Sequence, residues 1–273
     1  MSHRYFSFLI LLSSFLFIEV TLAKTVLVTG SNRGMGLEFV SQYAEKGWNV
    51  IATSRSPSDD NDLINLAKAN PNIQIEKMDV TNVKEILSLA DKYESQSIDL
   101  LINNAGMSGD RANQAWGQID KKEFEKLMSI NAFGALKVSE AFSRNISMSE
   151  EKKIVAISSV AGSISSMGRP SSLPILSISK AALNMAMKTI ALRLKDDGVT
   201  VILMNPGAVD TRALRQAFGL SLEEAEKATN FDYKGYPTVS AEEGVKRMIR
   251  VIETVDHSQS GSFLNHDGKE LLW

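Results

Sequence analysis

The chain contains no cysteine and only three histidines among its 273 residues. Without cysteine there is no disulfide framework, no thiolate nucleophile and no zinc site built on cysteine. The scattered histidines leave too few donors for a metal centre, so we expect none. The formal net charge is only -2, and a surface without excess positive charge does not attract a phosphate backbone. Nucleic acid is therefore not an expected partner.

The chain also lacks a long hydrophobic run. Its strongest one, from Tyr5 to Ile18, is shorter than the roughly 20 residues that a helix needs to cross a bilayer. His3 and Arg4 precede this run, and the segment Thr21–Ala23 offers small residues at the spacing of a cleavage site. Residues 1–23 therefore match a cleaved signal peptide, with an uncleaved membrane anchor as the alternative. We expect the secretory pathway, meaning an endoplasmic reticulum lumen, a periplasm or secretion, if the signal is used.

Hydrophobic residues make up 44% of the chain and charged residues 23%, which is enough to bury a large core. Undivided α/β folds commonly reach roughly 200–250 residues. No internal repeat or low-complexity tract breaks the sequence. We therefore expect residues 24–273 to form one domain.

Short apolar runs alternate with longer amphipathic segments along this domain. The runs predicted as strands are Thr25–Thr29, Asn49–Ser54, Ile73–Asp79, Leu100–Asn103, Ile154–Ser158 and Val199–Met204. The segments predicted as helices are Gly36–Lys46, Asn82–Tyr93, Lys122–Ile130, Ala132–Ser147 and Ser177–Lys195. Such alternation predicts an α/β fold of the Rossmann type, a doubly wound parallel sheet that binds ligands beyond the carboxyl ends of its strands.

A glycine-rich turn follows the first predicted strand. It reads Thr29-Gly30-Ser31-Asn32-Arg33-Gly34-Met35-Gly36, so that glycines allow the backbone to approach a pyrophosphate while a helix N-terminus points its N–H groups at it. The alternative is a tight strand-to-helix turn in which the glycines only pack the helix. The second strand ends in Arg55, where a ribose-binding acid would stand in an NAD site. Arg33 and Arg55 would clamp a 2′-phosphate, which favours NADP over NAD.

Several ordered motifs of the chain resemble the short-chain dehydrogenase/reductase family. The turn at Gly30 matches its cofactor signature, and Asn103-Asn104-Ala105-Gly106 matches its second motif. The resemblance continues from Lys24 onward through Met78–Val80, Ile130–Ala132, Ile157–Ser159, Ser179–Leu183 and Asn205–Gly207. The ending Gly261–Gly268 and the terminal Trp273 are similar to the C-factor and sniffer-like carbonyl reductase branch. The family implies a small-molecule carbonyl or alcohol substrate and a nicotinamide cofactor, here NADP. Because NADP needs an enclosed compartment, this cofactor favours retention of the protein over its secretion.

The resemblance implies a role for each matching residue of the cofactor site. Asp79 would face the adenine amino group, Asn104 and Ala105 would flank the adenosine ribose, and Pro206–Thr211 would hold the nicotinamide amide. The alternative is that Asn103 and Asn104 only satisfy backbone groups between strands and that Pro206-Gly207 is an ordinary turn at the end of a strand. The complete predicted cofactor site comprises Gly30, Ser31, Asn32, Arg33, Gly34, Met35, Gly36, Arg55, Asp79, Val80, Asn104, Ala105, Gly106, Lys180, Pro206, Gly207, Val209 and Thr211.

The family's catalytic group contains Asn, Ser, Tyr and Lys, and the resemblance places three of them here. Ser159 would hydrogen-bond the substrate carbonyl, Lys180 would bind the nicotinamide ribose, and Asn131 would link a water to Lys180. The tyrosine belongs four residues before the lysine, one helical turn away on the same face. Leu176 stands there, and leucine can neither give nor accept a proton.

Three functions remain open from this pattern. The first is an NADP-dependent oxidoreductase on a carbonyl/alcohol pair that is slow or altered, since a general acid typically contributes roughly 10²–10⁴ in rate. The second is a non-catalytic NADP-binding protein that signals or serves as a scaffold. The third is a vestigial nucleotide site, against which the glycines and Arg55 argue.

Two further features leave alternatives open. The polar segment Arg212–Ser240 holds Tyr233 and Tyr236, which either pack a lid over the substrate or, less favoured, replace the missing acid. The segments Lys122–Ser147 and Ser177–Lys195 are candidates for an interface in a homo-oligomer, as the family implies. The sequence names no substrate, because the segment after Thr211 fixes no pocket shape.

Overall fold

The computed structural model describes residues 23–168, 171–228, 231–235 and 237–273. Nearly all of the predicted leader and Tyr236 lie outside the described residues. Within them, seven parallel strands form one sheet in the order β3-β2-β1-β4-β5-β6-β7. The strands are β1 (Thr25–Thr29), β2 (Asn49–Ser54), β3 (Ile73–Lys77), β4 (Leu100–Asn103), β5 (Lys153–Ile157), β6 (Thr200–Asn205) and β7 (Phe263–Asn265). The predicted single-domain Rossmann-type fold is confirmed.

The central strands are apolar on both faces because helices cover both sides of the sheet. In β1, Val26 and Val28 face one helical layer, and Leu27 faces the other. All three are fully buried. This alternation explains why the strand reads as a continuous apolar run in the sequence.

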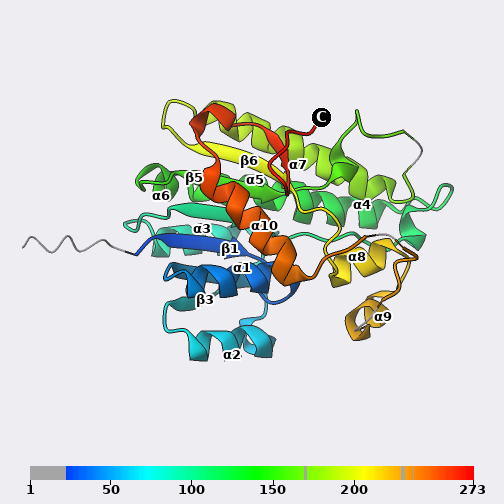
Figure 1. The fold of residues 1–273 in the computed structure, drawn as a ribbon, viewed down its shortest axis with the longest axis horizontal. Coiled ribbons are helices and arrows are strands. Elements are labelled where there is room, and N and C mark those ends of the chain that lie inside the picture. Colours follow the sequence, from blue (N-terminus) through cyan, green and yellow to red (C-terminus); the bar gives the residue numbers. More distant parts are fainter. Residues whose placement is uncertain (1–22, 169–170, 229–230, 236) are drawn as a thin grey trace, which may run out of the picture.

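Two layers of helices sandwich the sheet (Figure 1). One layer contains α1 (Gly34–Glu45), α2 (Asn61–Ala69) and α10 (Ala241–Thr254). The other contains α3 (Val83–Lys92), α5 (Ala135–Ala141) and α7 (Pro174–Arg193), with α4 (Lys121–Met128) packed on α7. The remaining helical elements are α6 (Ser143–Ser147), α8 (Arg212–Ala217), α9 (Leu222–Lys227), the 3-10 turns Pro57–Asp59, Ala112–Gln114, Val160–Gly162 and His257–Gln259, and a π-helical turn, Ser129–Gly134.

The structure corrects some of the predicted boundaries. The segment Ala132–Ser147 is not one helix, because the π-helical turn Ser129–Gly134 precedes α5, and α6 is a separate short helix. Helix α7 begins at Pro174 rather than Ser177. Proline suits the first position of a helix, because the N–H that it lacks would have no partner there. Strand β7 and helix α2 were not predicted. Three residues of β7 are too few to show a period.

Helix α7 is, among the described residues, the one helix long and apolar enough to cross a membrane by length and composition. More than half of that stretch is buried inside the protein, and its contacts with α4, α5 and β6 make it a core helix.

The two ends of the sheet differ in what they carry. Helices α8 and α9 lie beyond the carboxyl ends of the strands, on the right of Figure 1. The described chain enters β1 at the opposite edge, from the exposed Ala23. The order of the strands reverses between β1 and β4, so the crevice of a doubly wound sheet falls beyond these two strands.

Candidate active site

Three glycines shape the turn after β1. Gly30 and Gly34 adopt positive φ angles of 67° and 53°, a region that L-residues with a side chain rarely enter. A Cβ on Gly36 would lie 2.0 Å from the carbonyl oxygen of Gly30. The backbone therefore folds tightly on itself, and no side chain caps the first N–H groups of α1.

Hydrogen bonds hold this turn against the neighbouring strand. Ser31 is fully buried, and its hydroxyl donates to the Val28 carbonyl at 2.9 Å. Asn32 donates to the Asp60 carboxylate at 3.1 Å, and the Ser54 hydroxyl at the end of β2 donates to the same carboxylate. Sequence reasoning missed Asp60, because only the fold brings it beside the glycine turn.

The ends of β1 and β4 are tied together at the topological switch. The side-chain amide of Asn104 donates to the carbonyls of Thr29 at 2.9 Å and Gly30 at 3.1 Å. In return, the Thr29 hydroxyl accepts the N–H groups of Asn104 and Ala105, both at 3.0 Å. The Asn104 side chain thus serves the backbone of the turn, and Ala105 lies against Gly30.

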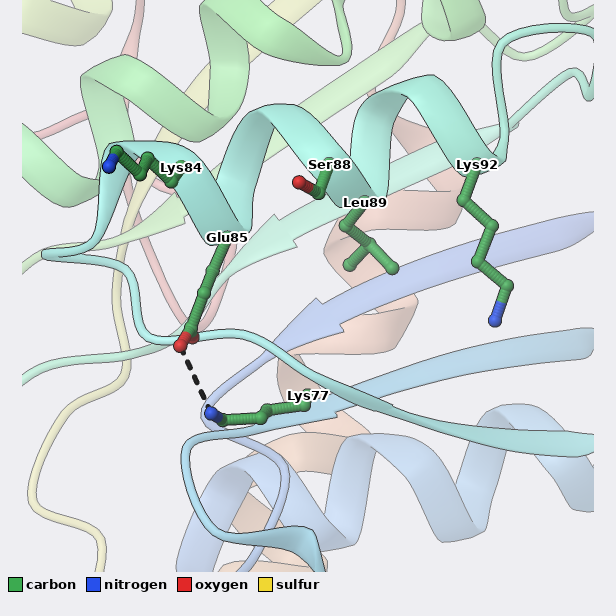
Figure 2. Close-up of a pocket in the computed structure, with 6 residues that line it drawn as sticks. All are labelled: Lys77, Lys84, Glu85, Ser88, Leu89 and Lys92. Carbon is green, nitrogen blue, oxygen red and sulfur yellow. Dashed lines mark ion pairs between the residues drawn. The ribbon is translucent and has the colours of Figure 1, made fainter.

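The predicted adenine end lies where β3 stops. Val80 is buried, and the Asp79 carboxylate accepts both the N–H and the hydroxyl of Thr81. An open cleft of about 290 Å³ lies between α3 and the end of β3. Glu85 of α3 pairs there with Lys77 at 3.1 Å, and Figure 2 shows the two side chains pointing toward each other. Glu85 also accepts the Asp79 N–H at 2.8 Å, and this bond is the main reason that the pKa of Glu85 is lowered. The Glu85 carboxylate thereby holds the backbone at Asp79 in place.

The predicted catalytic residues Asn131 and Lys180 meet at Gly106. A Cβ on Gly106 would lie 3.3 Å from the Asn131 amide oxygen and 3.5 Å from the Lys180 ammonium nitrogen. Asn131 lies in the π-helical turn and spends its side chain on neighbours. Its oxygen accepts the Met107 N–H, and its nitrogen donates to the Met107 carbonyl and to the Ser179 hydroxyl, all at 2.9 Å.

Lys180 and Ser159 both lie at the end of β5. The ammonium of Lys180 donates to the Ile157 carbonyl at 2.8 Å, two residues before Ser159. The Ser159 hydroxyl caps the following turn by accepting the Ala161 N–H at 3.1 Å. Burial lowers the pKa of Lys180 from the usual 10.5 to about 8, because removal from water disfavours the charged form.

Leu176 lies one turn before Lys180 on α7 and is partly buried. Its backbone N–H, which belongs to the first turn of the helix and has no partner within it, donates to the side-chain oxygen of Gln114 at 2.9 Å. Gln114 is fully buried, and its amide nitrogen donates to the Ser108 carbonyl at 2.8 Å. Gln114 thus joins the loop after β4 to the start of α7, a contact that no sequence pattern revealed.

The segment after β6 closes the site from the other side. Gly207 has a φ of 72°, and a Cβ there would lie 2.5 Å from the His266 ring, so this turn packs tightly after Pro206. Val209 is buried and forms a bridge to Val239. Thr211 caps α8 through its hydroxyl, and its methyl group lies 3.6 Å from where a Cβ of Gly34 would be.

The two arginines predicted to hold a 2′-phosphate differ in their surroundings. Arg33 pairs with Glu226 of α9 at 3.0 Å. Arg55 is exposed at the end of β2, and no partner for it occurs among the described residues.

Tyr233 packs the segment that follows α9. It is 6% exposed and contacts the rings of Phe218 and Phe231 edge-on. Its hydroxyl donates to the Asp210 carboxylate, and burial raises the pKa of Tyr233 to about 12. These contacts favour packing of a lid over the role of a substitute acid. Tyr236, the other candidate, lies outside the described residues.

The family model for short chain dehydrogenases matches residues 24–219 of the chain. The chain belongs to this family. The short chain dehydrogenase gsfK of Penicillium aethiopicum is 34% identical over 257 residues, which cover 91% of this chain and 99% of that protein. The C-signal protein of Myxococcus xanthus is 29% identical over 177 residues, 64% of this chain and 93% of that one. The family assignment accounts for the sheet order and for the shared motifs.

A solved structure supports the same assignment. The crystal structure of NADPH-bound carbonyl reductase from chicken fatty liver has a TM-score of 0.77 and 29% sequence identity to this protein, and the match covers 92% of this chain and 99% of that one.

The lowered pKa of Lys180 leads to a test by protein stability. Below about pH 8 Lys180 is charged in both the folded and the unfolded states, so the cost of burying the charge is constant. Between about 8 and 10.5 the unfolded chain binds more protons, so the free energy of unfolding rises with pH. Between about pH 7.5 and about pH 9.5, the free energy of unfolding of the unmodified protein, measured in urea, should therefore rise by roughly 2 kcal/mol through Lys180. The variant Lys180→Met should not show this rise. Parallel curves for the two proteins would contradict the lowered pKa.

Proposed function

We propose that the protein is an NADP(H)-binding oxidoreductase that acts on a small-molecule carbonyl/alcohol pair and is slow or altered in its proton transfer. The observation that carries this proposal is the convergence of Lys180 and Asn131 on Gly106, with Ser159 at the end of the same strand that Lys180 contacts. The NADPH-bound carbonyl reductase that the chain resembles supports the class of cofactor and substrate.

The residues of the glycine turn fit a dinucleotide. Because Gly36 has no side chain, the backbone of the turn can pack directly against the start of α1. At that N-terminus, free N–H groups and the helix dipole favour a diphosphate. Arg33 and Arg55 supply positive charge for a 2′-phosphate. Asp79 and Val80 border the adenine, and Pro206–Thr211 borders the nicotinamide.

The side chains at the end of β5 handle the substrate in this proposal. The bound nicotinamide supplies or accepts the hydride. The Ser159 hydroxyl donates a hydrogen bond to the carbonyl oxygen, and Lys180, with its pKa near 8, keeps a positive charge at neutral pH that favours a developing oxyanion. Asn131 holds the 106–107 loop against α7 and so fixes where Lys180 lies.

Leu176 limits the chemistry of this arrangement. It occupies the position, four residues before Lys180, at which the family places its proton-donating tyrosine. Water that reaches Lys180 and Ser159 is then the remaining source of the proton, and general acid catalysis by a side chain is worth roughly 10²–10⁴ in rate. We therefore propose slow reduction rather than none.

Leu176 also favours a second candidate function, a non-catalytic NADP-binding protein that signals or serves as a scaffold. In this case the nucleotide stabilises one shape of the domain and no substrate is converted. The name of the relative C-signal agrees with such a role. The same relative and the carbonyl reductase from chicken support placement in the C-factor and sniffer-like branch of the family, which we also propose.

Replacement of Leu176 by tyrosine separates the two functions. If only the acid has been lost, Leu176→Tyr should raise the turnover of NADPH with a panel of aldehydes and ketones by roughly 10²–10⁴, with little change in NADPH affinity. Leu176→Phe is the matched control, because it adds the ring without the hydroxyl.

The outcomes of this comparison are distinct. Tight NADPH binding with no turnover in any of the three proteins would favour the non-catalytic function. A parent as fast as Leu176→Tyr would contradict the role given to Leu176. Failure of NADPH to bind or to raise the melting temperature would remove both functions and leave a vestigial site.

We further propose that residues 1–23 direct the protein to the secretory pathway and are removed there. The domain needs none of them for its sheet, because β1 begins at Thr25. Chain entry at the edge opposite α8 and α9 (Figure 1) would leave the site open even in an anchored protein. Retention in an enclosed compartment such as the endoplasmic reticulum lumen suits a soluble cofactor.

Processing of the leader has a direct test. The full-length chain should be expressed in cells that have a secretory pathway and then analysed by mass spectrometry. Lys24 should be the first residue of the purified protein, because cleavage follows Thr21–Ala23. Ala23→Arg should block this cleavage and retain the leader. A full-length chain that fractionates with membranes would favour an anchor, and a full-length soluble chain would remove the proposal.

We also propose a homo-oligomer formed through the outer face of α5 and α7. On α7 the apolar residues Ile178, Met185 and Leu192 recur every seven residues and are 49–69% exposed. Beside them Phe133 and Leu136 line a groove of about 450 Å³. A contiguous apolar surface of this kind is typical of an interface, and a two-fold axis would place the groove against the stripe of a second copy.

Light scattering should show a dimer or larger assembly at micromolar concentration. Met185→Glu, at the middle of the three exposed apolar residues of α7, should shift the equilibrium toward the monomer, because association would bury a charge without a partner. Lys121→Glu, on the exposed start of α4, should leave the mass unchanged. A monomeric parent would contradict the proposal.

A further inference from the structure

Three arginines from separate segments gather beside the glycine turn. Arg33 precedes α1, Arg55 follows β2, and Arg212 is the first residue of α8. Burial is the main cause that lowers the pKa of Arg212, and the positive charges of Arg33 and Arg55 lower it further. These charges are therefore close enough to repel one another, and an anion between them would relieve the repulsion.

One carboxylate of α9 lies between two of these arginines. A single oxygen of Glu226, Oε1, is 3.0 Å from Nη1 of Arg33 and 3.6 Å from Nη1 of Arg212. All three side chains retain contact with water, with 39%, 27% and 56% of Arg33, Arg212 and Glu226 exposed. Ion pairs of this exposure are weak and exchange readily with other anions.

The helices that carry Arg212 and Glu226 are fastened to each other. Arg215 of α8 forms a two-pronged ion pair with Asp210, at 2.7 and 3.0 Å, and its guanidinium also donates to the carbonyls of Ala225 and Ala228 at the end of α9. Ala225 is fully buried. Residues 210–228 thus form one unit, which we call the flap, and Thr211 sets it directly against Gly34.

We propose that Arg212 is a third phosphate-binding cation of the nucleotide site, and that Glu226 is an internal stand-in for the phosphate that the nucleotide must displace. The inference rests on the proposed function, because it takes the 2′-phosphate of NADP(H) as the displacing anion. Three cations face the carboxylate of Glu226 and that of Asp60, which Asn32 and Ser54 already hold, so an excess of positive charge remains at this point. A phosphate carries about twice the charge of a carboxylate and three acceptor oxygens, so it satisfies all three arginines better.

Displacement of Glu226 couples the nucleotide to the flap. When the phosphate takes Arg33, Glu226 loses its strongest partner, while Arg215 and Asp210 still hold α8 and α9 together. The flap then contacts the site through Arg212 and the phosphate instead of through Glu226. The flap would thereby respond as a whole to the 2′-phosphate.

Binding of 2′,5′-ADP and 5′-AMP, measured by calorimetry on the full domain, tests this proposal without turnover. Glu226→Gln should bind 2′,5′-ADP about two- to fivefold more tightly than the parent, because a competing exposed ion pair is gone. In the Glu226→Gln background, Arg212→Gln should weaken 2′,5′-ADP by a similar factor, and Arg212→Lys should restore part of the loss. Binding of 5′-AMP should change by less than about twofold in every variant, because it lacks the 2′-phosphate.

Glu223→Gln is the matched control, since Glu223 lies on the same helix and pairs with Lys227 at 2.6 Å rather than with an arginine. Its affinity for 2′,5′-ADP should equal that of the parent. Hydrogen exchange in α9 should change on addition of 2′,5′-ADP but not of 5′-AMP, and thermal melting confirms that each variant is folded.

The outcomes distinguish this inference from the proposed function. If 2′,5′-ADP does not bind the parent, the NADP site itself is wrong. If it binds the parent and Glu226→Gln equally, or binds Glu226→Gln more weakly, Glu226 is not a stand-in and the inference fails. Equal effects of Arg212→Gln on 2′,5′-ADP and 5′-AMP would likewise remove Arg212 from the phosphate site.

Discussion

The link between Thr29 and Asn104 is the contact on which the rest of the site depends. Thr29 ends β1 and Asn104 follows β4, and their hydrogen bonds join the two strands at the point where the order of strands reverses. This fixes the carbonyl of Gly30, against which Gly36 packs with no room for a Cβ. The direction of α1, and with it the place of the N–H groups at its start, follows from this one junction.

A second group of contacts fixes the chemistry at the other end of the crevice. Asn131 lies in the π-helical segment Ser129–Gly134 and hydrogen-bonds the loop after β4. Its side chain also donates to Ser179, the residue before Lys180. The frame that would position a proton donor is therefore complete, while Leu176 offers only a backbone N–H, which Gln114 occupies. Decay of an unused domain would scatter damage over such a frame. The proposed change is instead confined to one position, so we propose that Leu176 marks a specific change in chemistry or in purpose.

The charges around the nucleotide turn link these two ends. We propose that the arginines before α1, after β2 and at the start of α8 form a site for an anion; the flap brings its own carboxylate to two of them. The tight unit that Arg215 forms with Asp210 makes the flap respond as a whole. An electrostatic contact with Arg33 can in this way act on the whole flap.

The sequence by itself determined the sheet-and-helix alternation, six of the seven strands, and the motifs whose residues the fold brings to one edge. These are local properties, set by hydrophobic period and by the glycines of a short turn. Only the tertiary structure decided the partners of Arg33, the place of Asp60 beside Asn32, the bond of Gln114 to Leu176, and the π-helical turn at Asn131, which replaces the start of the predicted helix Ala132–Ser147. Arg33 and Glu226 are separated by 193 positions, and no pattern within one segment can pair charges that meet only after the chain has crossed the sheet.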